Sequence, residues 1–96
     1  MATFIALIDF TDKGIGQIQD TTKRSAEFRE QVGALGARVK YVYWTMGAHD
    51  GVLVFEAPDD ETASAILLKL AGRGMVRSQM LRAFGSAEMD SILAKM

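Results

Sequence analysis

A chain of 96 residues with a formal net charge of −1 and no cysteine is long enough for one domain with one hydrophobic core. Hydrophobic residues make up 49% and charged residues 24%, as in ordinary globular proteins, so disorder is not expected. The balanced charge gives no reason to expect nucleic acid or an anionic membrane as a partner, and the absence of cysteine excludes disulfides, thiolate catalysis and cysteine-based metal sites.

The first predicted element is a strand over residues 3–10 (TFIALIDF). Both of its faces are largely apolar, so both are expected to be covered. Asp9 interrupts the apolar run too early for the core of a signal peptide, and no apolar run approaches the ~18 residues of a membrane span. We therefore expect a cytoplasmic protein.

A helix is predicted next, over residues 21–35. The preceding residues 11–20 are polar, contain two glycines and predict a loop or a single irregular turn. Gly36 stands where a glycine commonly follows the end of a helix. The apolar side chains that recur at the spacing of one helical face are Phe28, Val32 and Leu35.

Residues 38–56 predict an antiparallel hairpin. Strict alternation in the first strand places Val39, Tyr41 and Tyr43 on one face and Val42, Trp44 and Met46 on the other. A loop around Gly47 leads into a third strand over residues 49–56. The two strands are joined by too few residues for a crossover, so they must run antiparallel.

A second helix, a fourth strand and a terminal helix complete the chain. Pro58 and the acidic residues 59–61 predict the start of the second helix, and two glycines predict its end. Residues 75–84 predict a strand whose polar side chains indicate a sheet edge. Ser86 is expected to cap the terminal helix. The predicted apolar stripes of the two helices are Ala63, Ile66, Leu67 and Leu70, and Met89, Ile92, Leu93 and Met96.

The order β-α-β-β-α-β predicts a ferredoxin-like α+β fold, in a single domain over residues 1–96. Such a fold has a four-stranded antiparallel sheet with two helices on one face, here followed by a C-terminal helix. The first and third strands are apolar on both faces, so the uncovered face would expose a patch of the order of several hundred Å². We expect a second copy of the chain to cover this face across a two-fold axis, which would form a dimeric α+β barrel.

Three segments carry a family likeness: TFIALIDFTDKGI at the start, YVYWTMGAHDGVLVFEAPDDETA in the centre and LRAF near the end. Together they resemble the GYD-domain family of small bacterial proteins, over nearly the whole chain. The resemblance implies membership of the dimeric α+β barrel superfamily and implies no particular activity. The Gly–Tyr–Asp signature of the family lies at the start of the third strand. Here Gly47 and Asp50 match it, and His49 stands where the tyrosine would be.

His49 and Asp50 form the most suggestive polar pair. A histidine beside an acid could act as a base, a proton shuttle or a ligand. In the alternative, Gly47 supplies a turn, Asp50 accepts hydrogen bonds from loop amides and His49 fills an aromatic position. Adjacent strand residues point to opposite faces, which favours this alternative. Because the chain has one histidine and no cysteine, we expect no metal, haem or other cofactor.

Aromatic side chains could line an apolar ligand pocket between sheet and helices, although ordinary core and interface packing is the favoured explanation for each of them. Arg82 on the edge strand could orient an anionic ligand, or it could be part of a solvated edge. No catalytic residue is identified. The candidate ligand-binding residues are Tyr43, Trp44, His49, Asp50 and Arg82.

These features predict a small homo-oligomeric protein that binds a small apolar ligand or acts as an accessory protein. Two alternatives stay open. One is a cofactor-independent monooxygenase or isomerase acting on a small hydrophobic substrate, which the superfamily supports by analogy of fold alone. The other is a structural assembly protein that uses its apolar surfaces to build higher oligomers. A sizeable pocket would favour either of the first two roles over the third.

Overall fold

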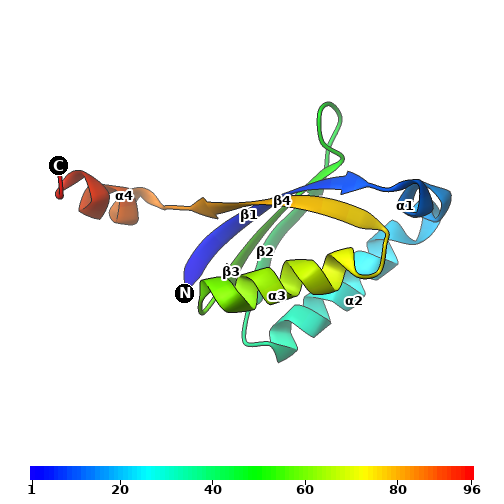
Figure 1. The fold of residues 1–96 in the computed structure, drawn as a ribbon, viewed down its shortest axis with the longest axis horizontal. Helices are drawn as coiled ribbons and strands as arrows, with labels where there is room; N and C mark the ends of the chain where they lie inside the picture. The colour runs from blue at the N-terminus through cyan, green and yellow to red at the C-terminus, as the bar shows by residue number, and fades with distance from the viewer.

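The computed structural model describes residues 1–96 and has helices on one side of a four-stranded antiparallel sheet (Figure 1). This confirms the predicted ferredoxin-like α+β fold. The strands are β1 (Ala2–Phe10), β2 (Arg38–Trp44), β3 (Gly51–Ala57) and β4 (Val76–Ala83). The helices are α1 (Asp12–Gly16), α2 (Thr21–Ala34), α3 (Asp60–Ala71) and α4 (Ser86–Leu93), with a short 3-10 turn over Ile18–Asp20.

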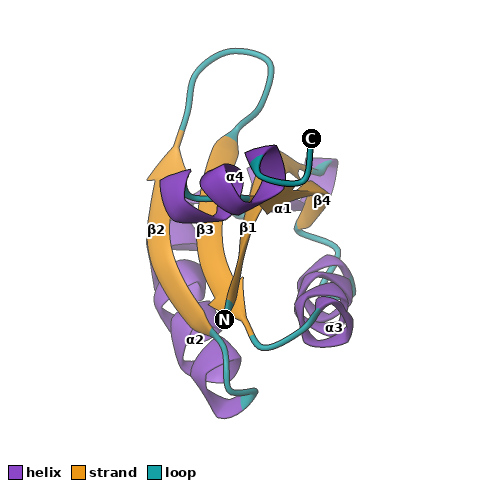
Figure 2. Cartoon of the chain, turned by 90° about the vertical axis from the view of Figure 1, so that its left-hand side faces the viewer, coloured by secondary structure: helices purple, strands orange, loops and turns teal.

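The strands lie in the order β2-β3-β1-β4. β1 is central and pairs antiparallel with both β3 and β4, while β2 pairs only with β3. The fourth strand therefore lies at a sheet edge, as its polar sequence predicts. The loop between β2 and β3 extends beyond the end of the sheet (Figure 2), and Gly47 within it has a φ of +118°, which favours glycine.

The hydrophobic core lies between the sheet and the two helices α2 and α3. Phe4 of β1 and Phe55 of β3 are fully buried and stack with ring centroids 5.5 Å apart. Each contributes about 1.5–3 kcal/mol through burial of its side chain. The helices supply Val32 from α2 and Ile66 from α3, which are also fully buried. Because this core is made by one face of the sheet, it leaves the other face without cover from either helix.

That other face, which we term the open face, is largely apolar and carries neither α2 nor α3 (Figure 1). Tyr41 and Tyr43 stack on it with centroids 6.2 Å apart, and their side chains are 52% and 57% exposed. The strand pairings place these apolar residues on the open face: Ile5, Leu7, Tyr41, Tyr43, Val52, Val54 and Leu81.

A β-bulge in β2 corrects the strict alternation predicted for this strand. The register shifts between Val39 and Tyr41, where Lys40 is the extra residue. As a result Val39 pairs with Phe55 on the helix-covered face and is buried, whereas Tyr41 lies on the open face. The predicted grouping of Val39 with the tyrosines is therefore wrong, because one inserted residue reverses the orientation of every side chain after it.

The segment predicted as a loop over residues 11–20 contains a short helix. The side chain of Thr11 accepts a hydrogen bond from the Gly14 amide at 3.1 Å and donates to the Gly74 carbonyl at 2.5 Å. Gly14 is buried so close to β4 that a β-carbon would lie 2.0 Å from the carbonyl oxygen of Met75. The cap made by Thr11 is a local signal, but the contacts with Gly74 and Met75 join residues about sixty positions apart and could not be read from the local sequence.

The two later helices begin with different caps. Asp59 caps α3, and its carboxylate accepts a hydrogen bond from the Thr62 amide at 2.7 Å, which confirms the predicted acidic start. For α4 the predicted cap is wrong: Gly85 is the N-cap and Ser86 is the first helical residue. Glu88 explains the difference, because its side chain accepts from the Gly85 amide at 3.3 Å.

α4 projects away from the rest of the molecule at the end of β4 (Figure 1). None of its residues is buried, and its predicted apolar stripe is exposed along its length. None of the four helices combines the length and the apolar character that crossing a membrane requires.

Candidate functional site

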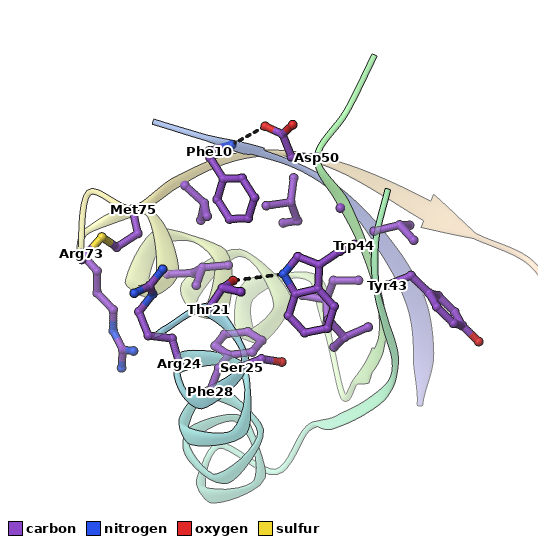
Figure 3. A pocket seen from close by; sticks show the side chains of 17 residues that line it. Phe10, Thr21, Arg24, Ser25, Phe28, Tyr43, Trp44, Asp50, Arg73 and Met75 are labelled. Carbon is purple, nitrogen blue, oxygen red and sulfur yellow. Dashed lines mark hydrogen bonds between the residues drawn. The ribbon is translucent and has the colours of Figure 1, made fainter. Parts of the chain in front are cut away.

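A half-open cavity of about 110 Å³ lies between α2 and the end of the sheet where β1 finishes (Figure 3). Most of the residues that line it are hydrophobic. The end of α3 and the segment that leads into β4 close one side of it, through Leu70, Arg73 and Met75. The residues that line the cavity therefore come from the sheet, from α2 and from the end of α3 with the segment that follows it.

The sheet side of the cavity is built around Trp44, the last residue of β2. Its indole N–H donates to the Thr21 hydroxyl at 3.0 Å, which ties the end of β2 to the first turn of α2. Gly51, which stands opposite Trp44 in the strand pairing and has no side chain, also lines the cavity. Phe10 of β1 forms a further apolar wall (Figure 3).

The helix side of the cavity is one face of α2, formed by Thr21, Arg24, Ser25 and Phe28. These positions are spaced i, i+3, i+4 and i+7, the spacing of a single helical face. The sequence prediction began this face at Phe28 and missed the three polar residues before it. Extending the Phe28–Val32 stripe backwards by two turns is the signal that would have found them.

Two arginines from different helices lie at the edge of the cavity. The Arg24 guanidinium donates to the Gln17 carbonyl at 2.9 Å, and the guanidinium of Arg73 donates to the Gln31 side chain. Neither arginine takes part in the two arginine–glutamate ion pairs of the chain or in the contact between His49 and Asp9. Both are half-buried, and Figure 3 shows their side chains on the same side of the cavity.

Asp50 lines the cavity but is already engaged. Its Oδ2 accepts from the backbone N–H of Phe10 at 2.9 Å, its own amide donates to the Ile8 carbonyl at 2.8 Å, and its carbonyl accepts from the Thr45 amide at 2.9 Å. The sequence interpretation assigned loop amides to Asp50. The carboxylate instead bonds the end of the neighbouring strand, because β3 begins opposite Ile8, two residues before the last residue of β1.

His49 lies outside the cavity. Its Nδ1 is 3.2 Å from the Oδ2 of Asp9, an acid at the end of β1, and the two side chains are 35% and 47% exposed. His49 and Asp50 are therefore not hydrogen-bonded to each other, and each bonds a different residue of β1.

Arg82 lies at the opposite end of the sheet from the cavity, paired with Phe4. Its guanidinium lies 4.6 Å from the centroid of the Phe84 ring and 3.3 Å from Glu88 of α4. These contacts join the end of β4 to the first turn of α4. Of the five candidate residues, Trp44 and Asp50 line the cavity, whereas His49 and Arg82 do not. Tyr43 borders the cavity as well, but its ring points away from it onto the open face (Figure 3).

The carboxyl groups with clearly altered acidity also lie away from the cavity. A hydrogen bond from Arg38 lowers the pKa of Glu56, and hydrogen bonds from Thr62 lower the pKa of Asp59. The backbone N–H of Gly85, together with Arg82, lowers the pKa of Glu88. Glu56 and Glu88 thereby join two elements of the fold each, and Asp59 caps α3. No three histidine, aspartate or glutamate side chains come together in a way that could hold a metal ion.

Comparison with known proteins gives one family and two relatives. The family model described as GYD domain matches residues 4–93. The glutamine synthetase and cystathionine beta-lyase binding protein of Thermus thermophilus is 34% identical over 90 residues, which cover 93% of this chain and 95% of that protein. The crystal structure of TTHA0845 from Thermus thermophilus superposes with a TM-score of 0.58 at 23% identity, over 90% of this chain and 96% of that one. This second likeness concerns the fold alone.

Proposed function

This chain belongs to the GYD domain family, and on that premise we propose that it is a cytoplasmic, homodimeric accessory protein. It binds other proteins and holds a small apolar ligand in the cavity beside Trp44. The observation that carries the proposal is the open face, an apolar sheet surface that no helix of the same chain covers.

The size of the open face supports pairing with a second copy. Four strands about 4.8 Å apart and eight residues long at about 3.3 Å each present roughly 500 Å². A stable interface buries about 800 Å² on each partner. The exposed stripe of α4 lies on a projecting segment and can supply the difference by packing on the other copy. Two-fold pairing of the sheets buries both open faces at once.

The relative in Thermus thermophilus supports the binding of further proteins. That protein is described as binding glutamine synthetase and cystathionine beta-lyase, and it aligns with this chain over nearly its whole length. We propose that this chain binds an enzyme of the same kind through surfaces that stay exposed once the open face is covered. On α3, Leu68 is 73% exposed and faces away from the sheet, which makes it available to such a partner.

Binding is favoured over catalysis by the state of the polar groups in the cavity. The Asp50 carboxylate accepts from the Phe10 amide, and the Trp44 N–H donates to Thr21, so both groups have structural partners. A monooxygenase or isomerase that moves a proton would need a free general base, and Asp50 is the only carboxylate in the cavity lining, which contains no histidine. The cavity itself favours ligand binding over a purely structural assembly role.

Sedimentation velocity at micromolar protein concentration tests the dimer. We expect the wild-type protein to be at least dimeric. Val54→Asp, at the centre of the open face, should yield a monomer, and Leu81→Asp, at an already exposed position of the same face, should weaken the dimer with less risk to the fold. Leu68→Asp on α3 is the control and should remain dimeric. A folded wild-type monomer at this concentration would refute the proposed dimer.

Biolayer interferometry with glutamine synthetase and cystathionine β-lyase from the same organism tests the accessory role. We expect the wild-type protein to bind at least one of the two enzymes. The dimeric Leu68→Asp variant then reports whether α3 contributes. Failure to bind either enzyme, with the dimer intact, would refute this choice of partners.

A further inference from the structure

We propose that the ligand of the cavity is a small monocarboxylate with a flat apolar body, whose carboxylate is bound by Arg24 and Arg73. This inference rests on the proposed function, because it assigns a chemical class to the ligand of the same cavity. The supporting observations are the shape of the walls, the volume, and two guanidinium groups at the edge that have no acidic partner.

The walls select an apolar, planar body. Trp44, Phe10 and Phe28 contribute aromatic rings from three separate elements (Figure 3). The indole N–H of Trp44 is occupied by Thr21, so the indole presents its apolar ring to the cavity. At about 10–15 Å³ for one water-sized group, a cavity of about 110 Å³ holds of the order of ten non-hydrogen atoms. A single substituted ring has this size.

The edge of the cavity selects an anion. Arg24 and Arg73 each donate one hydrogen bond to a neutral oxygen, of Gln17 and Gln31 respectively, and keep further N–H groups free. Guanidinium groups match the geometry of a carboxylate and can bind it with paired hydrogen bonds. An apolar cavity with two unpaired cations at its edge therefore fits a ligand that is apolar at one end and anionic at the other.

The charge count favours a monoanion over a dianion such as a phosphate monoester. The charged residues that line the cavity are Arg24, Arg73 and Asp50, which sum to a net charge of +1. The Asp50 carboxylate is bonded to the Phe10 amide on the sheet side of the cavity, away from both arginines (Figure 3), so it disfavours negative charge on that side. The ligand is thereby oriented with its apolar ring toward the sheet and its carboxylate toward the arginines.

The experiment compares benzoate with benzamide, a neutral probe of nearly the same shape. Trp44 is the only tryptophan in the chain, so its fluorescence reports on occupancy of this cavity, and calorimetry checks the affinity independently. We expect benzoate to bind at least tenfold more tightly than benzamide. Arg24→Gln and Arg73→Gln should each weaken benzoate about tenfold, the loss expected for one charge-assisted hydrogen bond, and should leave benzamide unchanged.

Two control variants complete the design. Lys23→Gln removes a cation from an exposed position of the same helix outside the cavity, and it should bind benzoate like the wild-type protein. Ser25→Leu fills the cavity from the α2 side and should weaken both probes equally, without depending on either arginine.

The outcomes separate this inference from the function on which it rests. Equal affinity for benzoate and benzamide, or arginine variants that bind benzoate like the wild-type protein, would overturn the carboxylate assignment and leave the apolar ligand site standing. Binding of neither probe at concentrations up to about 10 mM, where even weak complexes form, would overturn both. The oligomeric state is measured separately and does not depend on either result.

Discussion

Replacing Asp50 with alanine should lower the free energy of unfolding by about 2 kcal/mol. The carboxylate accepts from the Phe10 amide at 2.9 Å, and a hydrogen bond to a charged group contributes about 1.5–3 kcal/mol. Phe10 is half-buried, so water can replace part of the lost bond, and this places the expected value below the top of that range. The backbone bonds of residue 50 to Ile8 and Thr45 should survive the substitution, because they do not involve its side chain.

Urea unfolding followed by circular dichroism measures this loss at one fixed protein concentration, since the stability of an oligomer depends on concentration. In thermal unfolding, about 2 kcal/mol corresponds to a fall in Tm of roughly 8–16 °C for a domain of this length. Amide hydrogen exchange at Phe10 should accelerate in Asp50→Ala and change less in Asp50→Asn, which retains an oxygen acceptor.

Asp9→Ala is the matched control. Asp9 lies at the end of the same strand and contacts His49 at 3.2 Å, but its side chain is 47% exposed, so its loss should cost less than about 0.5 kcal/mol. If Asp9→Ala costs as much as Asp50→Ala, or if exchange at Phe10 is unaffected by Asp50→Ala, the role assigned to Asp50 is wrong.

Three further predictions, which use four substitutions, test other parts of the structure. His49→Tyr, which introduces the signature tyrosine of the family, should change the free energy of unfolding by less than roughly 1 kcal/mol, because the ring lies outside the cavity and core; a larger loss in urea unfolding would contradict this. Gly14→Ala should destabilise the fold by about 2–3 kcal/mol, because the new β-carbon would overlap the backbone carbonyl of Met75. Gly33→Ala, at an open position inside α2, is the control and should stabilise the fold by about 0.5–1 kcal/mol. Equal effects of the two substitutions in thermal melts would refute the close contact between Gly14 and Met75. Because the pKa of Asp59 is lowered in the folded protein, its carboxylate stabilises the fold at a pH above the ordinary pKa of 3.8, and this stabilisation is lost as the pH falls through the lower folded-state pKa. The difference in urea midpoint between the wild-type protein and Asp59→Asn should therefore shrink below pH 3.8. A difference that stays constant with pH would contradict the role of Asp59.

Features with local signals were predictable from the sequence. Gly36 follows α2 with a φ of +77°, a conformation that glycine adopts without strain, so it marks the helix end in the sequence and in the structure. Asp59 marks the start of α3, because its side chain accepts a hydrogen bond from the amide of Thr62, only three residues further along the chain. The short connection between β2 and β3 allows only an antiparallel hairpin. These signals are sufficient to give the order of elements and therefore the fold.

Features that depend on contacts between distant residues were not predictable. The extra residue Lys40 is defined by how β2 pairs with β3, and nothing in the local alternation marks it. The cavity also depends on contacts between distant residues. Arg24 belongs to α2 and Arg73 follows α3, and only the packing of the fold brings both to the edge of the cavity. Trp44 was identified as a candidate from its residue type, but the Thr21 hydroxyl that orients its ring became evident only in three dimensions.

From its length and exposure we expect the order of the projecting helix α4 to depend on contact with another molecule. It has eight residues, and isolated helices shorter than about 12–15 residues are marginal in water. No residue of α4 is buried, so its own chain contributes little to hold it helical. The segment should therefore fold as it docks. Part of the docking free energy is spent on ordering the backbone, which makes the contact weaker and easier to reverse than its apolar area suggests.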